Sequence, residues 1–200
     1  MQTRLVLLFA LATFGWLPAL SQEASVRVRG RIEKVEADIY VISSRDAKLL
    51  RVKLAPTATV VAIVKADILD IKPGEFVGVA ALPQPEGTLR ALEVHIFPEA
   101  MRGTGEGHRA WDLQPNSTMT NANVEQATVM ANGSELRLKY KDGEKTVEVR
   151  SATPVVRYAP ADESELKPGA SVFIGAAKPM PDGSLEAARV SVGRDIDPPM

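Results

Sequence analysis

The sequence predicts an all-β protein built as two tandem small β-barrels, and three observations lead to that fold class. Apolar and polar residues alternate along short stretches, which is the period of a half-buried strand. Turns that contain Gly or Pro separate these stretches, and the helical pattern never exceeds a single turn. The same turn motifs occur twice in the same order, in a chain of 200 residues that allows one ordinary domain or two small ones.

The first strand begins at Ser25, where Val26 and Val28 alternate with arginines and so form one apolar face. Further strands are expected at residues 39–43, 49–54, 59–64, 75–81 and 88–97. A single helical turn is expected at residues 66–70, directly before a Lys-Pro-Gly turn at residues 72–74. These elements make up one unit of about 70 residues.

The second half of the chain repeats this plan. Residues 71–74 (Ile-Lys-Pro-Gly) match residues 166–169 (Leu-Lys-Pro-Gly) at an offset of 95 positions. The Pro-x-Pro-acid-Gly turn of residues 83–89 matches residues 179–185 at an offset of 96. Several turn motifs in one shared order indicate an internal duplication.

Each unit is expected to close into a small barrel, because a flat sheet of that size leaves exposed edges and an unburied face. The helical turn would cover one open end of a closed or partly open barrel, as in oligonucleotide-binding (OB-like) folds. The alternative is one continuous sandwich made from both copies. The expected organisation is a signal peptide at 1–21, a first barrel at 22–98, an ordered connector at 99–120, a second barrel at 121–193 and a loose tail at 194–200.

The N-terminus has the pattern of a cleaved secretory signal. Residues 1–4 carry one positive charge, residues 5–17 are apolar, and Ala19 and Ser21 supply the small residues of a cleavage site before Gln22. The apolar run is short for a membrane span, so an uncleaved anchor is the less favoured alternative. The expected location is therefore the periplasm or the extracellular space, with no membrane span after cleavage.

The composition excludes several classes of function. The chain has no cysteine, so disulfides, thiolate metal sites and a thiol nucleophile are ruled out. Its formal net charge is −1, which offers no basic footprint for a nucleic acid. The remaining partners are an envelope protein or a small ligand.

A metal site is one candidate function of the connector. The expected ligands are His108, His95, Met101, Glu106 and Met119, because imidazole with thioether ligands suits copper and imidazole with carboxylates suits zinc. The alternative for His108 is a hydrogen bond to nearby backbone. His95 is out of phase with the apolar residues of its strand, so it should point away from the barrel interior into solvent.

Three further connector residues, Trp111, Arg109 and Asp112, are expected to contact a ligand or to join the two barrels. Trp111 is the only tryptophan outside the leader. An indole in a glycine-rich segment either docks into a groove or waits for a partner, and docking is the favoured interpretation.

The sequence shows no motif of a known catalytic class. A nucleophile elbow, a His-Glu-x-x-His motif and a phosphate-binding loop are all missing from the sequence. The expectation is a non-catalytic binding or interaction protein without a cofactor. The alternatives are a metal-handling accessory protein that uses copper or zinc, and an envelope enzyme with an unrecognised site.

The chain resembles exported bacterial proteins that carry tandem small OB-like β-barrel domains of unknown function. The resemblance rests on the leader, the repeated β-rich units and the connector residues at 106–109, 111–112 and 117–122. It implies a fold and a periplasmic setting, with no established activity.

Overall fold

The computed structural model describes residues 24–198, so the expected signal peptide lies outside the described residues. The fold is all-β, as predicted, with three short turns of 3-10 helix. The strands are β1 (Val26–Glu36), β2 (Ile39–Ser44), β3 (Leu49–Lys65), β4 (Phe76–Pro83), β5 (Leu89–Ile96), β6 (Gly107–Ala110), β7 (Thr118–Met130), β8 (Gly133–Tyr140), β9 (Gly143–Arg150), β10 (Val155–Pro160), β11 (Ser171–Pro179) and β12 (Leu185–Gly193). The helical turns are η1 (Ile68–Asp70), η2 (Glu99–Met101) and η3 (Glu163–Glu165).

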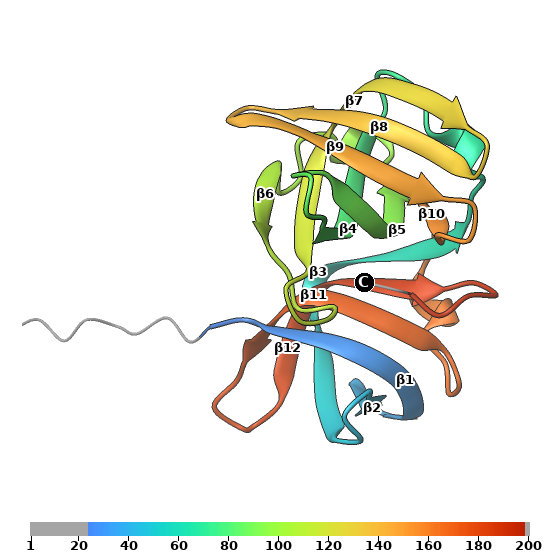
Figure 1. Ribbon diagram of the computed structural model, residues 1–200. Coiled ribbons are helices and arrows are strands. Elements are labelled where there is room, and N and C mark those ends of the chain that lie inside the picture. The colour runs from blue at the N-terminus through green and yellow to red at the C-terminus, as the bar shows by residue number, and fades with distance from the viewer. Residues whose placement is uncertain (1–23, 199–200) are drawn as a thin grey trace, which may run out of the picture.

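Five strands form a closed barrel, which is the lower part of Figure 1. β1 pairs with β2 and β11, β2 pairs with β3, and β11 pairs with β12, all antiparallel. The barrel closes where β12 runs parallel to β3. The side chains that alternate inward fill it with one apolar cluster, which includes Val28, Ile32, Ile42, Ile174 and Val190.

Five other strands form a second ring of pairings, in the upper part of Figure 1. β4 pairs with β5 and β7, β7 with β8, and β8 with β9. β9 returns to β5 in parallel over two residue pairs, Leu89 with Val147 and Arg90 with Glu148. This second ring encloses a separate apolar cluster, which includes Val79, Val94, Ala122, Leu138 and Val149.

Both sets of strands draw on both halves of the chain. The closed barrel combines β1–β3 from the first repeat unit with β11 and β12 from the second, and the second ring combines β4 and β5 with β7–β9. The two sets are joined by β10, which is antiparallel to the end of β3 and parallel to β5. Strands that precede the connector at 99–120 therefore pair with strands that follow it. The sequence instead predicted that each unit forms a barrel from its own strands.

The strand at residues 49–54 and the strand at 59–64 are one long strand, β3, in the structure. Against β12, Leu54 is opposite Ala187 and Thr59 is opposite Arg189, so residues 55–58 bulge out of the ladder. Pro56 lies in this bulge, where its missing N–H costs no ladder hydrogen bond.

The C-terminal residues 194–198 are held by contacts, and the predicted loose tail is wrong for them. The backbone N–H of Arg194 donates to the Ile63 carbonyl at 3.0 Å, and its guanidinium pairs with Glu165 at 2.7 Å. Asp197 forms an ion pair with Arg31 at 3.2 Å.

The connector is ordered, as predicted, and it contains η2 and the short strand β6. β6 pairs with the first part of β7, which fixes the connector against the second ring. Among residues 24–198, no helix is long and apolar enough to cross a membrane.

Candidate functional site

A cleft of about 310 Å³ lies between the closed barrel and the second ring. Four aromatic residues, two methionines, two arginines and several small or polar residues line it: Phe97, Trp111, Tyr158, Phe173, Met101, Met119, Arg109, Arg189, Thr104, Asn121, Gly175, Ala176, Ala188 and Ser191. A mostly apolar concave surface with a few polar groups is the usual form of a small-molecule site. We name it the aromatic cleft.

Strand alternation places the β7 side chains of the cleft on the outer face of the second ring. Met119 and Asn121 alternate along β7 with residues that face the interior, such as Ala122. Gly78 on β4 lies beneath this face, where a Cβ atom would come within 2.9 Å of both Phe97 Cε2 and Asn121 Oδ1. The missing side chain of Gly78 therefore makes room for one aromatic and one amide of the cleft wall.

Trp111 is docked in the structure, which is the interpretation that the sequence favoured. It packs against Ala80, Met119 and Phe173, and the guanidinium of Arg27 lies 4.0 Å from the centre of its ring. Its backbone N–H donates to the Ser117 carbonyl at 2.8 Å, which turns the connector back toward the cleft.

Asp112 anchors this part of the connector to β1. Its carboxylate pairs with Arg29 at 2.7 Å and with Arg27 at 3.2 Å. The hydrogen bond from Arg29 is the main reason why the pKa of Asp112 is lowered. The connector thus joins a strand of the closed barrel to the second ring.

Two polar atoms on the walls of the aromatic cleft are buried without a hydrogen-bond partner among the described residues. They are Trp111 Nε1, a donor, and Asn121 Oδ1, an acceptor. The amide nitrogen of Asn121 does have a partner, because it donates to the Thr104 carbonyl at 2.8 Å. Native proteins rarely leave such atoms unpaired, so each of them calls for an explanation.

A buried acid and a buried histidine lie side by side behind Tyr158. Glu93 and His95 are two residues apart on β5, so their side chains point to the same face, and each is 1% exposed. Glu93 Oε1 is in contact with His95 Nε2, and the Tyr158 ring lies 5.6 Å from the His95 ring. Figure 1 shows β5 at the level where the two rings of strands meet.

Burial decides the protonation of this pair. Loss of water raises the pKa of Glu93 and lowers the pKa of His95, while the charges of Arg45 and Arg29 only partly oppose the effect on Glu93. Burial therefore favours the neutral form of both groups, in which the carboxyl O–H of Glu93 donates a hydrogen bond to Nε2 of His95. The prediction that His95 points into solvent was wrong, because β10 and the closed barrel cover the outer face of β5.

The expected metal ligands are dispersed. His108 Nδ1 lies 2.8 Å from Thr120 Oγ1, a Glu106 oxygen accepts from the Lys141 backbone N–H at 2.9 Å, and Met119 is buried. Met101 lines the aromatic cleft, where its sulfur contacts Arg189. Within residues 24–198, no three His, Cys, Asp or Glu side chains come together as a metal site.

The sequence analysis named no site role for the cleft residues Phe97, Asn121, Tyr158, Phe173 and Arg189. Each lies on or beside a strand, and its pattern is that of an ordinary strand residue. The signal that singled out Trp111 and Arg109, an unusual connector composition, was absent for these five.

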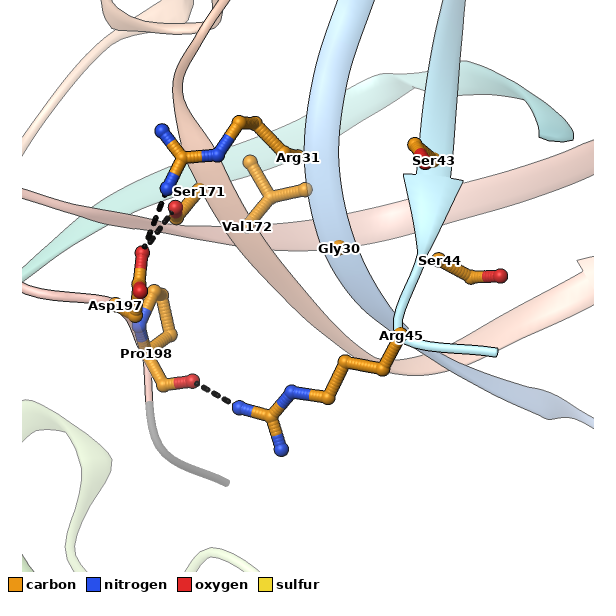
Figure 2. Close-up of a pocket in the computed structure, with 9 residues that line it drawn as sticks. All are labelled: Gly30, Arg31, Ser43, Ser44, Arg45, Ser171, Val172, Asp197 and Pro198. Carbon is orange, nitrogen blue, oxygen red and sulfur yellow. Dashed lines mark hydrogen bonds and ion pairs between the residues drawn. The ribbon is translucent and has the colours of Figure 1, made fainter. Parts of the chain in front are cut away.

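A second hollow, of about 210 Å³, lies where the C-terminal residues cross β1 and β2. Figure 2 shows Arg31 and Arg45 converging on Asp197 and Pro198 from two sides of this hollow. Arg31 pairs with Asp197, Arg45 donates to the Pro198 carbonyl at 3.2 Å, and Ser171 also bonds Asp197. These polar groups already have protein partners, so this hollow is explained by the anchoring of the chain end.

The aromatic cleft is a concave surface in which four aromatic rings lie beside two arginines. Comparisons with known proteins found no protein-family model, no curated protein and no solved structure that matches this chain.

Proposed function

We propose that this protein is a non-catalytic binding protein whose ligand, a small planar aromatic molecule, occupies the aromatic cleft. The observation that carries the proposal is the combination of four aromatic residues with two unpaired buried polar atoms in one cleft. Aromatic rings bind flat molecules by stacking, and the polar atoms would orient a ligand that carries its own donor and acceptor. Both polar atoms are covered in this structure, so binding requires side-chain rotations of the kind common at binding sites.

We also infer the finer architecture: a duplicated OB-like unit whose two copies exchange their last two strands. The order β1-β2-β3-β12-β11 has the strand order and parallel closure of a small OB-like barrel, and β7-β8-β9-β5-β4 repeats that order. The matched turns support the duplication. Gly74 and Gly169 have φ of 91° and 89°, and η1 and η3 lie 95 positions apart.

The exchange has an approximate two-fold axis. In the antiparallel pair of β3 with β10, Ile63 is opposite Tyr158, and these residues are 95 positions apart, the offset of the repeat. Gly74 N–H bonds the Val124 carbonyl and Gly169 N–H bonds the Ile32 carbonyl, both at 2.8 Å. Two copies related by such an axis make a self-complementary interface, and the aromatic cleft lies along it.

The proposed place of action is the periplasm or the extracellular space. Support for this comes from residues 1–21 alone, which have the charged start, apolar run and small residues of a secretory signal.

A fluorescent apolar probe tests the binding proposal. Phenylnaphthylamine, which is flat and uncharged, should bind residues 22–200 saturably and quench Trp111 by energy transfer. Ala188→Phe fills the cleft from β12 and should abolish binding, because Ala188 is an exposed lining residue. Ala131→Phe, in the exposed turn between β7 and β8, is the matched control and should bind like the wild type. Unchanged binding in Ala188→Phe, with a normal melting temperature, would place the ligand elsewhere.

A further inference from the structure

The aromatic cleft carries positive charge that no carboxylate neutralises. Arg109 donates to the Gly105 carbonyl at 2.7 Å, and Arg189 contacts the Met101 sulfur at 3.7 Å. Within the described part of the chain, neither guanidinium forms an ion pair. No Asp or Glu is among the residues that line the cleft.

Other arginines around the two rings of strands do have acidic partners. The pairs are Arg29 with Asp112, Arg102 with Glu99, Arg157 with Asp70 and Arg194 with Glu165. The chain as a whole is slightly acidic, with 25 acids against 24 bases, so carboxylates are not scarce. The positive charges of Arg109 and Arg189 therefore lack an acidic partner because no carboxylate is placed beside them, and not because the chain has few carboxylates.

Like charges add to this local excess. Arg27 lies over the Trp111 ring at 4.0 Å and Arg109 lies at 5.6 Å from the same ring. Partial burial is the main cause that lowers the pKa of Arg109, and the charge of Arg27, which shares Asp112 with Arg29, lowers it further. An anion bound beside Arg109 would relieve this repulsion, whereas a cation would increase it.

We propose that the ligand of the aromatic cleft is a planar aromatic anion, a ring system that bears a carboxylate or a sulfonate. The rings of Phe97, Trp111, Tyr158 and Phe173 contact its flat faces, and Arg109 and Arg189 hold its charged group. A volume of about 310 Å³ admits a molecule of two or three rings. This inference rests on the proposed function, to which it adds the charge of the ligand.

Two matched probes separate the contribution of the ligand's negative charge to its affinity from the contribution of its aromatic rings. Anilinonaphthalene sulfonate is an aromatic anion, and phenylnaphthylamine has nearly the same rings without the sulfonate. The anion should bind residues 22–200 about tenfold more tightly, the effect of one charge-assisted contact. Arg109→Gln and Arg189→Gln should each remove most of this difference, because each should weaken binding of the anion far more than binding of the neutral probe. Arg137→Gln, on the exposed face of β8, is the control and should change neither affinity.

The outcomes separate the two proposals. Equal affinities for both probes, unaffected by the arginine variants, would overturn the anionic ligand and leave the binding cleft in place. Saturable binding of neither probe would overturn the cleft itself. Binding of the anion that survives Ala188→Phe would also overturn this inference, because the sulfonate would then bind outside the cleft.

Discussion

At the residue scale, the burial of Glu93 and His95 costs folding free energy, because both side chains lose water. Each has only the other as a polar contact. Charged forms of both groups are disfavoured by loss of water, so one proton is shared between a carboxylic acid and a neutral imidazole. Tyr158 separates the pair from the aromatic cleft, and its ring contacts those of both His95 and Phe97. The pair therefore supports one wall of the cleft.

The stability of the protein should fall between pH 6.5 and 8 because of Glu93. Burial raises the pKa of Glu93 from 4.5 to about 8, so the folded chain keeps a proton that the unfolded chain has lost. The lowered pKa of His95 acts in the opposite direction only below its ordinary value of 6.5, where the unfolded chain gains a proton. Over this window the free energy of unfolding should drop by about 2 kcal/mol.

Glu93→Gln should remove this drop, because an amide can donate to His95 Nε2 and does not titrate. Urea unfolding at pH 6.5 and pH 8 measures the slope, and Glu135→Gln on the exposed face of β8 serves as the control. The same drop in wild type and Glu93→Gln would show that Glu93 is ionised in the folded protein.

The turns before β4 and β11 fix the exchanged strands at the element scale. Gly74 and Gly169 each take a positive φ and each donate a backbone hydrogen bond to a strand of the other repeat unit. A Cβ atom at either position would meet no other atom within 4 Å. A substitution there therefore tests backbone conformation alone.

Gly74→Ala and Gly169→Ala should each destabilise the protein by about 1 kcal/mol, since a side chain disfavours a positive φ. The two losses should be equal if the turns are equivalent copies. Thermal unfolding of both variants and of the double variant provides the measurement. A large loss for one variant and none for the other would contradict the equivalence.

Local chemistry made the strands and turns predictable. Period-two alternation predicted β1, and the Lys-Pro-Gly motifs predicted the turns that follow η1 and η3. Residues 55–58 were the exception, because Pro56 is typical of a strand end and the bulge that accommodates it depends on β12. The alternation within a strand predicts which of its faces is apolar. It does not predict which other strand pairs with it.

The exchange of strands could not be predicted for a physical reason. On the proposed duplication, both halves of the chain have the same apolar pattern, so β4 and β5 could pair with β1–β3 as well as with β7–β9, with which they do pair. The burial of His95 could not be predicted for the same reason. Its place in the alternation along β5 predicted a side chain that points out of the barrel. Only the pairing of β5 with β10 shows that Tyr158 covers this side chain. Trp111 could be singled out because its place in the connector was unusual on sequence grounds alone.

At the scale of the whole molecule, the two repeat units are held together by strand pairing. β4 pairs with β7 from Phe76 to Ala81, β1 pairs with β11, and β12 pairs with β3 over eight residues. The connector contributes little of this pairing. Residues from both halves of the chain line the aromatic cleft, so the cleft depends on the pairing between them.

Cutting the connector tests this account most directly. A protease site placed after Gly103, which is exposed and has a positive φ, would allow the folded chain to be cleaved between the two units. If the strands are exchanged, the two fragments should elute together in size-exclusion chromatography at the volume of the intact chain. They should unfold in one transition and separate only in denaturant. Fragments that separate on dilution in native buffer, each still folded, would contradict the exchange and with it a cleft formed by both units.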